Sequence, residues 1–295
     1  MKAKQLKSAF LLLLTATIWG VAFVAQSVGM DYVGPFTFNA VRCVIGGAVL
    51  LPCIAVLDRL RGPDAKKGDR RTLCISGVLC GVVLWAASNL QQIGIQYTTV
   101  GKAGFITACY VVLVPVLGIF LKKRCRFIVW IGVAMTLAGL WLLCINGKFN
   151  INAGDIYVLA CALVFSIHIL VIDHYSPLVD GVRMSCIQFF VCGVLSGICM
   201  LIFEEPKMGD ILAAWEPILY AGVLSCGVAY TLQIVGQKGI NPTVASLILC
   251  LESVVSVLAG WLILDQALSA RELAGCALVF AAVVMVQCWP EKQKK

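Results

Sequence analysis

Charged side chains are scarce in this sequence. Asp, Glu, Lys and Arg make up 13% of its 295 residues, whereas a soluble globular domain has about 25%. Hydrophobic residues reach 61%, and the mean hydropathy is +0.95. These values exclude an ordinary soluble domain. The segments between the apolar runs are also short, which leaves no room for a soluble catalytic domain on either face of a membrane.

Residues typical of metal and nucleotide chemistry are lacking as well. The chain has only two histidines, six residues apart, and no pair of carboxylates within its apolar runs. It has no Gly-rich phosphate-binding loop, so we expect no ATP-driven motor within this chain. The 15 cysteines form no C-x-x-C pair and lie almost entirely inside apolar runs. We interpret them as small apolar side chains. We therefore predict no metal, no cofactor and no enzymatic activity.

Long apolar runs are what the sequence does contain. Each is long enough, at about 1.5 Å per residue, to cross a bilayer core as a helix. A signal peptide would also begin with a basic segment, but the first run is too long for one and further runs follow. We predict an all-α polytopic membrane protein with ten transmembrane helices, at about residues 8–28, 36–57, 72–93, 100–121, 127–145, 155–172, 184–203, 218–235, 241–265 and 272–289.

The basic residues are distributed unevenly between the two faces of this predicted bundle. Eighteen of the 23 Lys and Arg residues fall on the side of the N-terminus, four on the opposite side, and Arg42 lies within a span. Positive charge accumulates on cytoplasmic loops, so we predict a cytoplasmic-membrane protein with both termini in the cytoplasm. The net charge of +8 is then explained by orientation, and nucleic acid is not needed as a partner.

The second half of the chain is a weak copy of the first. One constant shift in residue number, which we call the repeat shift, pairs Leu90 with Leu232, Gln91 with Gln233, Gly94 with Gly236, Ala103 with Ala245 and Gly118 with Gly260. Five crossings per half would place the halves in opposite orientations. We therefore predict two inverted five-helix repeats, residues 1–147 and 148–295. This architecture is typical of alternating-access transporters, which bind their substrate near the bilayer midplane.

Glu252 interrupts the ninth run ten residues after Pro242, which is a favourable first residue for a helix. It therefore lies roughly 15 Å into the membrane. A carboxylate at that depth is costly unless it is paired, protonated or facing water. It is a candidate cation partner or proton carrier, and a structural pair with another helix is the alternative.

Arg42 lies roughly 9 Å into the second run, with Asn39 on the same helix face. It could extend to the outer interface or pair there with Asp31. Alternatively, its guanidinium could bind a carboxylate or phosphate of a substrate.

Two spans carry similar polar faces. Trp85, Asn89 and Gln92 are spaced i, i+4, i+7, and Cys226, Tyr230 and Gln233 repeat this spacing in the equivalent span. Each amide could simply bond to a neighbouring helix, but the repetition favours a cavity. With a tyrosine, a histidine and a tryptophan from other spans, the predicted substrate-binding residues are Trp19, Asn39, Arg42, Asn89, Gln92, Tyr110, His168, Tyr230, Gln233 and Glu252.

The ordered motifs of the chain resemble the drug/metabolite transporter superfamily, specifically its EamA-type members. They are Thr17-Ile18-Trp19-Gly20, Phe38-x-x-x-Arg42, the Phe105-to-Pro115 stretch, Gly154-Asp155 and the ninth span around Glu252. The resemblance covers essentially the whole chain and implies two inverted repeats around a central cavity. The family often has Glu-Pro where this chain has Glu252-Ser253, and a Glu closing the fourth span where this chain has Lys122-Lys123-Arg124.

These observations predict a secondary transporter of a small organic metabolite, acting as an exporter, with protons as one possible coupling ion. One acid, one base and several aromatic rings would suit an amphiphilic zwitterion such as an amino acid. A flippase for a lipid-like substrate and a channel are the alternatives within transport. An integral-membrane enzyme on lipid-linked substrates is the alternative outside it, but it would need clustered acid/base or metal-ligand residues.

Overall fold

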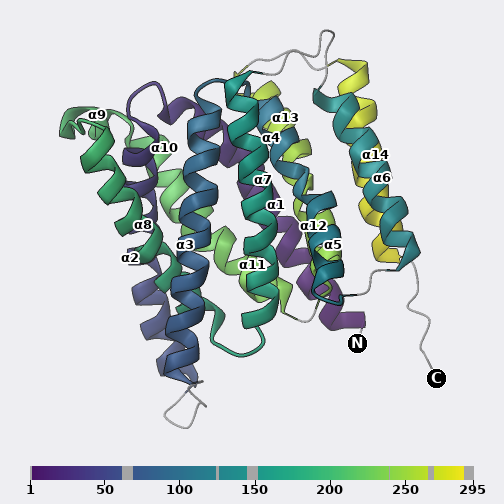
Figure 1. The fold of residues 1–295 in the computed structure, drawn as a ribbon, viewed down its shortest axis with the longest axis horizontal. Helices are drawn as coiled ribbons and strands as arrows, with labels where there is room; N and C mark the ends of the chain where they lie inside the picture. Colours follow the sequence, from purple (N-terminus) through teal and green to yellow (C-terminus); the bar gives the residue numbers. More distant parts are fainter. Residues whose placement is uncertain are drawn as a thin grey trace.

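The computed structural model describes residues 2–61, 69–123, 126–144, 152–238, 240–264 and 269–288. Within these residues every regular element is a helix (Figure 1). In chain order the helices are α1 (Lys2–Gly29), α2 (Pro35–Arg61), α3 (Arg70–Ile95), α4 (Val100–Ala108), α5 (Tyr110–Phe120), α6 (Phe127–Cys144), α7 (Ala153–Tyr175), α8 (Gly181–Phe203), α9 (Met208–Ala213), α10 (Trp215–Leu219), η1 (Tyr220–Tyr230), α11 (Thr231–Gln237), α12 (Pro242–Leu249), α13 (Leu251–Leu264) and α14 (Ala270–Cys288).

Eight helical stretches are long and apolar enough to cross a membrane, which confirms a multi-span helical fold. They coincide with eight of the predicted spans: Gln5–Gly29, Pro35–Leu60, Arg70–Ile95, Val100–Phe120, Ala153–Tyr175, Gly181–Phe203, Trp215–Gln237 and Pro242–Ile263. At the fifth predicted span α6 has a shorter apolar stretch, Phe127–Leu142. At the tenth lies α14, which is 19 residues long. The count of ten crossings stays a prediction.

Polar residues next to the apolar runs determine where several helices begin. The side chain of Asn241 accepts a hydrogen bond from the backbone N–H of Thr243, and Pro242 follows as the first helical residue of α12. Thr99 caps α4 in the same way. Asn152 and Asp155 form a reciprocal capping box at the start of α7. Each cap satisfies backbone donors that a helix start leaves without a partner.

The fourth and ninth predicted spans are each broken into two helices. Cys109 separates α4 from α5, and Cys250 separates α12 from α13. Beside each turn the backbone changes to i→i−3 bonds, such as Cys109 N to Ile106 O at 3.2 Å and Ser253 N to Cys250 O at 3.1 Å. Neither break lies at a proline, since α5 continues through Pro115.

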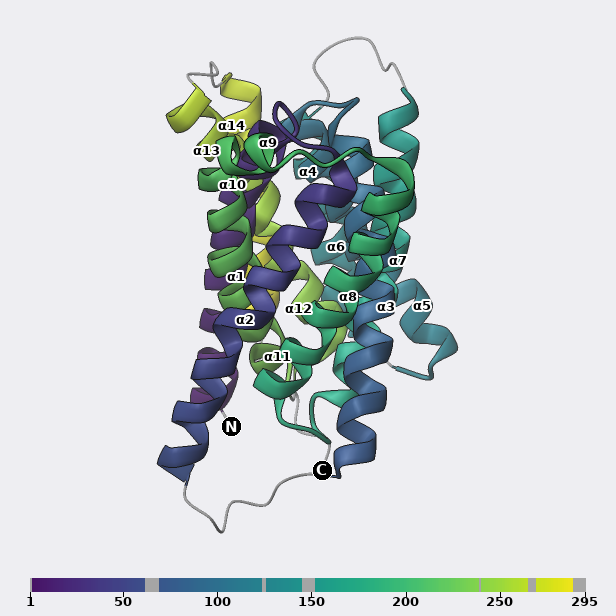
Figure 2. The same cartoon turned by 90° about the vertical axis from the view of Figure 1, so that its left-hand side faces the viewer.

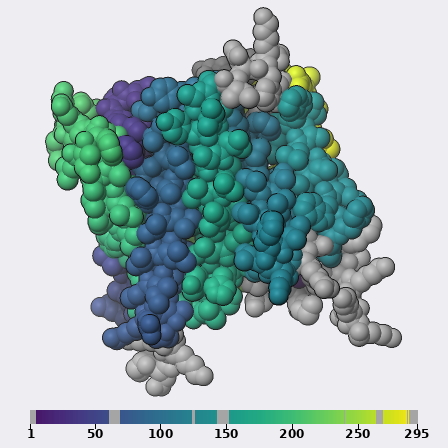
Figure 3. Space-filling view, in the orientation of Figure 1, coloured from purple at the N-terminus to yellow at the C-terminus, as the bar shows by residue number. Residues whose placement is uncertain are grey.

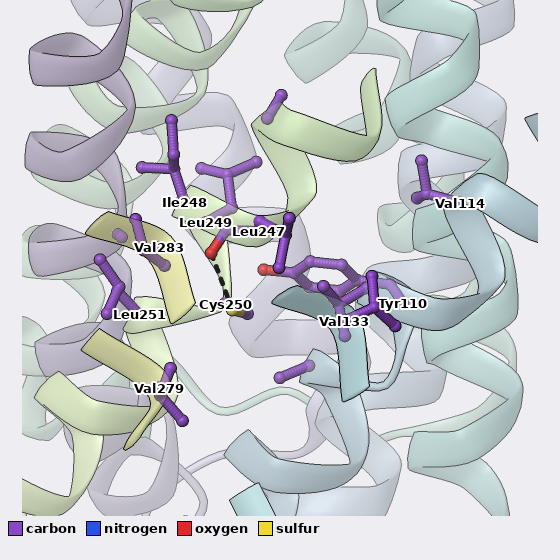
Figure 4. Packing of buried hydrophobic residues seen from close by; sticks show 14 of the residues in the cluster. Tyr110, Val114, Val133, Leu247, Ile248, Leu249, Cys250, Leu251, Val279 and Val283 are labelled. Carbon is purple, nitrogen blue, oxygen red and sulfur yellow. Dashed lines mark hydrogen bonds between the residues drawn. The ribbon is translucent and has the colours of Figure 1, made fainter. Parts of the chain in front are cut away.

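Apolar side chains hold these breaks in place. In Figure 4, Tyr110 points from α5 toward the turn at Cys250, among leucine, isoleucine and valine side chains of neighbouring helices. The Sγ of Cys250 donates to the carbonyl oxygen of Leu247 at 2.8 Å, which satisfies one acceptor at the end of α12. The breaks are therefore packed parts of the core.

The helices stand side by side in one bundle (Figure 1, Figure 2). α2 packs on α8, α3 lies against both α7 and α8, and α1 contacts α13, η1 and α11. α6 and α14 pack mainly on each other at one edge. Across one face of the space-filling view, α8, α3 and α7 lie next to one another without a wide gap (Figure 3). Many exposed side chains are large and apolar, as lipid contact requires.

A glycine on α3 sets how closely α3 approaches α8. A Cβ atom at Gly81 would lie 2.6 Å from Cβ of Val191 and 2.9 Å from the carbonyl oxygen of Gln188. Gly197 lies on α8, as Val191 does, but a Cβ atom at Gly197 would meet nothing within 4 Å. Only the first glycine is therefore required by close packing.

We predict that Gly81→Leu lowers the thermal unfolding midpoint in detergent, because overpacking costs about 1–3 kcal/mol. Gly197→Leu is the matched control and should keep the wild-type midpoint. Equal midpoints for the two variants would contradict the role of Gly81.

Candidate functional site

A cavity lined by both polar and apolar side chains lies inside the bundle, next to both helix breaks. Its walls come from α1, α2, α3, α4, α5, α7, η1, α11, α12 and α13. The lining residues are Trp19, Phe23, Gln26, Arg42, Gln91, Thr107, Tyr110, Phe165, Ile169, Ser225, Tyr230, Gln233, Leu249 and Glu252. Since both halves of the chain contribute, the cavity is our candidate functional site.

The cavity is narrow in this conformation. The space that the centre of a water-sized sphere can reach is about 30 Å³. One water needs about 10–15 Å³ by this measure, whereas pockets for drug-sized ligands measure about 300–1,000 Å³. Water can therefore enter, but an organic solute requires the surrounding helices to separate.

Glu252 lies in the first turn of α13 and is 4% exposed. Its Oε1 accepts a hydrogen bond from the hydroxyl of Tyr110, the first residue of α5, at 3.0 Å. No basic side chain of the described residues lies within ion-pair distance of its carboxylate. Because Tyr110 begins α5 and Glu252 lies at the start of α13, their hydrogen bond joins the two broken spans at their breaks.

Arg42 reaches the same cavity from α2 and is 3% exposed. Its guanidinium carbon lies 5.5 Å from the ring centre of Phe38, a cation–π contact. Within the described residues it has no carboxylate at ion-pair distance, and its Nε has no hydrogen-bond partner. Asp31 is exposed and does not pair with it. The guanidinium is thus buried rather than extended to the membrane surface.

Aromatic rings form one wall of the cavity. The rings of Trp19 and Tyr230 lie 4.5 Å apart, and Phe165 and Phe23 also contribute. Three further polar atoms of lining residues are buried without a hydrogen-bond partner in the described structure: Trp19 Nε1, Gln26 Oε1 and Gln233 Oε1. One donates and two accept. Buried polar atoms of this kind are normally bonded, so these three could bond to water or a ligand once the cavity widens.

Six of the ten sequence-predicted site residues line this cavity, and four lie outside its lining. The Nδ2 of Asn39 donates to Asn89 Oδ1 at 2.9 Å, and Asn89 Nδ2 donates to Ser196 at 3.0 Å. The Nε2 of Gln92 donates to the carbonyl oxygen of Gln26 at 3.1 Å. His168 is fully buried and bonds to Gln188. These four residues connect helices here, and a substrate role for them stays a prediction.

A family model matches nearly the whole chain in two consecutive pieces. The model describes the EamA-like transporter family, and it matches residues 6–145 and again residues 152–288. The chain belongs to the EamA-like transporter family. The resemblance found in the sequence motifs is thereby confirmed, and the protein is a multi-pass membrane transporter of that family.

Named relatives of this EamA-family protein are transporters as well. An "Uncharacterized transporter" of Archaeoglobus fulgidus is 30% identical over 289 residues, covering 96% of this chain and 86% of the relative. The "Uncharacterized inner membrane transporter YedA" of Escherichia coli is 25% identical, with 91% and 87% covered. These names favour transport over the enzyme alternative.

A solved structure titled "Crystal structure of protein" has the same fold. Its TM-score to this chain is 0.73, with 21% identity and coverage of 95% of this chain and 96% of the other. At this identity the likeness concerns the fold alone.

Several lining residues of this EamA-family cavity were not predicted from the sequence. Gln26 continues the face of Trp19 and Phe23 at i, i+4, i+7, so helical spacing could have found it. Gln91 is the equivalent of Gln233 under the repeat shift, which is a second available signal. Ser225 and Thr107 carry no such signal, because small hydroxyl residues also occur throughout the lipid-facing and packed parts of membrane helices.

The buried charge of Arg42 leads to a prediction about stability. A buried charge without a counter-charge destabilises a fold, and replacing buried charges by apolar residues of similar volume often stabilises by about 1–4 kcal/mol. We expect Arg42→Met to raise the thermal unfolding midpoint. Arg183→Met is the control: Arg183 is partly exposed and pairs with Asp58, so its loss should change the midpoint little. A fall in the midpoint of Arg42→Met would show that the guanidinium supports the fold.

Proposed function

We propose that the protein is a secondary transporter that moves a small organic solute across the cytoplasmic membrane by alternating access. The observation that carries this proposal is the cavity itself. It combines a buried guanidinium, a buried carboxylate and unpartnered polar atoms, with walls from both halves of the chain. Ionisable groups at this depth in a membrane typically mark a substrate or ion pathway.

We further propose ten transmembrane helices in two inverted repeats, residues 1–147 and 148–295. The family model supports this by matching each half separately. Packing contacts support it too. A Cβ atom at Gly94 would lie 2.5 Å from Val158, and one at Gly236 would lie 3.2 Å from Leu12. Gly236 is the equivalent of Gly94 under the repeat shift, and Leu12 of α1 corresponds to Val158 of α7, so the same contact between the halves occurs twice.

The π-helix η1 accounts for a change in the repeat shift along the chain. At the start of η1, which contains Gly222, and in the equivalent part of α3, the matching contacts are Gly81 with Val191 and Gly222 with Ile45. The separation of Gly81 and Gly222 in the sequence is one residue smaller than that of Gly94 and Gly236, which lie after the change. A π-helical stretch accommodates an extra residue within a helix. It therefore explains why the two polar faces compared in the sequence are offset by one residue.

The cavity lies where such repeats would meet. Under the repeat shift, lining residues form the equivalent pairs Gln91 with Gln233, Thr107 with Leu249, and Tyr110 with Glu252. Between α1 and α7 the constant shift is the one that relates Leu12 to Val158. The same shift relates two further pairs of lining residues, Trp19 with Phe165 and Phe23 with Ile169. In inverted-repeat transporters the substrate binds near the midplane at the repeat interface, often beside discontinuous helices. The breaks at Cys109 and Cys250 fit that position.

The chemistry of the lining favours an amphiphilic zwitterion such as an amino acid. Arg42 would bind its carboxylate, Glu252 would bind its ammonium group, and the rings of Trp19 and Tyr230 would contact its apolar part. His168 lies beside Tyr230, with ring centres 6.0 Å apart, and Gln92 bonds to Gln26. These two, with Asn39 and Asn89, would reach the solute once the cavity widens.

Export is the direction we propose, with both termini in the cytoplasm and protons coupled through Glu252. The orientation rests on the uneven distribution of Lys and Arg, because positive loops stay cytoplasmic. The coupling rests on the position of Glu252, which is buried near the middle of the span Pro242–Ile263 and free of a basic partner in the described structure.

Transport by purified protein tests the proposal. Proteoliposomes would be incubated with a mixed metabolite pool, with and without an imposed pH gradient, and their contents read by mass spectrometry. We expect selective accumulation of zwitterionic solutes that grows with the gradient. Accumulation that does not depend on the pH gradient would contradict proton coupling but support solute transport. No accumulation by folded protein would contradict solute transport, and translocation of labelled lipid would then favour the flippase.

Glu252→Gln should lower solute transport by at least about tenfold, which corresponds to ~1.4 kcal/mol at the transition state. It should also abolish the dependence of transport on the pH gradient, because an amide cannot carry a proton. Glu205→Gln is the matched control, since Glu205 is exposed outside the spans. Transport and pH dependence like the wild type would remove Glu252 from the mechanism.

A further inference from the structure

Ion pairs tie the broken span α4–α5 to α7 at both ends of the bundle. At the end opposite the start of α1, Lys102 of α4 pairs with Asp155 of α7 at 2.5 Å. At the other end, Lys123, just after α5, pairs with Asp173 of α7. Both aspartates are largely buried, with side chains 6% and 11% exposed. Such partly shielded pairs are weakened less by solvent and salt than fully exposed ones.

The pair at Asp155 is part of a larger network. The Oδ1 of Asp155 accepts a hydrogen bond from the hydroxyl of Thr98 at 2.9 Å, and its Oδ2 accepts one from the backbone N–H of Asn152 at 2.9 Å. The Nδ2 of Asn152 in turn donates to the carbonyl oxygen of Tyr97 at 2.9 Å. The start of α7 is therefore bonded to the segment between α3 and α4 at several points.

Charged groups also link α2 to α8 at both ends, although the partly exposed pair of Arg183 contributes little to stability. Arg183 at the start of α8 donates to both carboxylate oxygens of Asp58 near the end of α2, at 2.7 and 2.5 Å. After the end of α8, the carboxylate of Glu204 accepts from the backbone N–H groups of Phe36 and Thr37, both at 2.8 Å. A carboxylate at a helix start is stabilised by these donors and by the helix dipole.

The helices equivalent to α4–α5 and α7 are α12–α13 and α1, and their equivalent positions cannot form such pairs. Val244 and Ala9 occupy the positions equivalent to Lys102 and Asp155, and Ser27 occupies the position equivalent to Asp173. The equivalent of Lys123 is Asp265, which lies outside the described residues. One partner or both is uncharged at each end, so the sequence itself excludes an ion pair at these positions.

Apolar packing and central hydrogen bonds hold α12–α13 instead, and one of these bonds runs from Ser253 Oγ to the carbonyl oxygen of Gly104 at 2.8 Å. Val244 and Ala9 pack against the same buried apolar cluster. A Cβ atom at Gly20 of α1 would lie 2.4 Å from Cβ of Val255, so the helices touch closely at this point. Near the middle, Glu252 accepts the bond from Tyr110. These contacts lack the paired charges that fasten the other broken span.

We propose that α12–α13 forms the mobile gate of the transporter and moves relative to α1, and that α2, α4, α5, α7 and α8 form its rigid side. This inference rests on the alternating access proposed above. Movement of α12–α13 relative to α1 and to the rest of the bundle separates no ion pair at the equivalent positions, whereas movement of α4–α5 away from α7 separates two. Glu252 would lie on the gate and Arg42 on the rigid side. A zwitterion bound to both would draw the gate closed.

Installing the missing ion pair tests the gate. Ala9→Asp combined with Val244→Lys places a pair at the positions equivalent to Asp155 and Lys102. We expect this double variant to transport at least about tenfold more slowly than wild type, a change of ~1.4 kcal/mol. The single variants Ala9→Asp and Val244→Lys are the controls and should each transport faster than the double variant. Transport by the folded double variant at the wild-type rate would overturn the proposal.

Removing the existing pairs gives the complementary comparison. Lys102→Gln with Lys123→Gln should lower the thermal unfolding midpoint but keep transport within about twofold of wild type, a change of less than about 0.5 kcal/mol. These lysines lie outside the cavity lining. A large loss or gain of transport in this folded variant would mean that α4–α5 moves instead.

Hydrogen exchange of the wild-type protein tests the gate without a substrate and without a variant. In lipid nanodiscs, backbone amides at the ends of α12 and α13 should exchange faster than those at the ends of α4, α5 and α7, because less stable segments open more often. Equal or reversed rates would overturn the gate. Faster exchange without any solute transport would support the gate while contradicting the proposed function.

Discussion

The structure depends on the cost of placing ionisable side chains inside a membrane. Arg42 and Glu252 come from helices far apart in the sequence, and both are almost completely buried. A bilayer offers neither group water, so each must be enclosed by protein. The bundle meets this requirement by enclosing them in one cavity, whose lining includes hydrogen-bonding and aromatic side chains from several helices. The remaining surface can then be apolar and face lipid.

The helix breaks follow from the same requirement. An unbroken span would direct all its backbone groups into its own hydrogen bonds, and the turns at Cys109 and Cys250 change that pattern beside the cavity. They also place Tyr110 and Glu252 at the starts of α5 and α13, where the two side chains meet. Charged contacts elsewhere lie at the ends of helices, where lipid headgroups and water moderate their cost. In the described structure, ion pairs therefore lie at the ends of the helices, whereas Arg42 and Glu252 lie at the cavity without an ion-pair partner.

Much of this could be predicted from the sequence, for physical reasons. Apolar runs of membrane length are a strong signal, so eight spans were correctly placed, and Glu252 of the ninth predicted span is buried. The cap at Asn241 was readable because Asn followed by Pro is a local helix start. The break at Cys250 was not readable, since a turn of one residue without proline leaves no compositional trace. Likewise, the spacing of Asn89 and Gln92 gives their helix face but not which neighbour that face meets.

Equivalence between the halves has a consequence for how a solute would be oriented. Tyr110 and Glu252 occupy corresponding positions in the proposed repeats and bond to each other. Gln188 of α8 corresponds to Arg42 of α2, just as Val191 corresponds to Ile45, and it lies outside the cavity lining. If the proposed repeats carried the same groups at these positions, the two sides of the cavity would be alike and a bound solute could take either orientation. Because the positions differ, the proposed site would hold a zwitterion in one orientation.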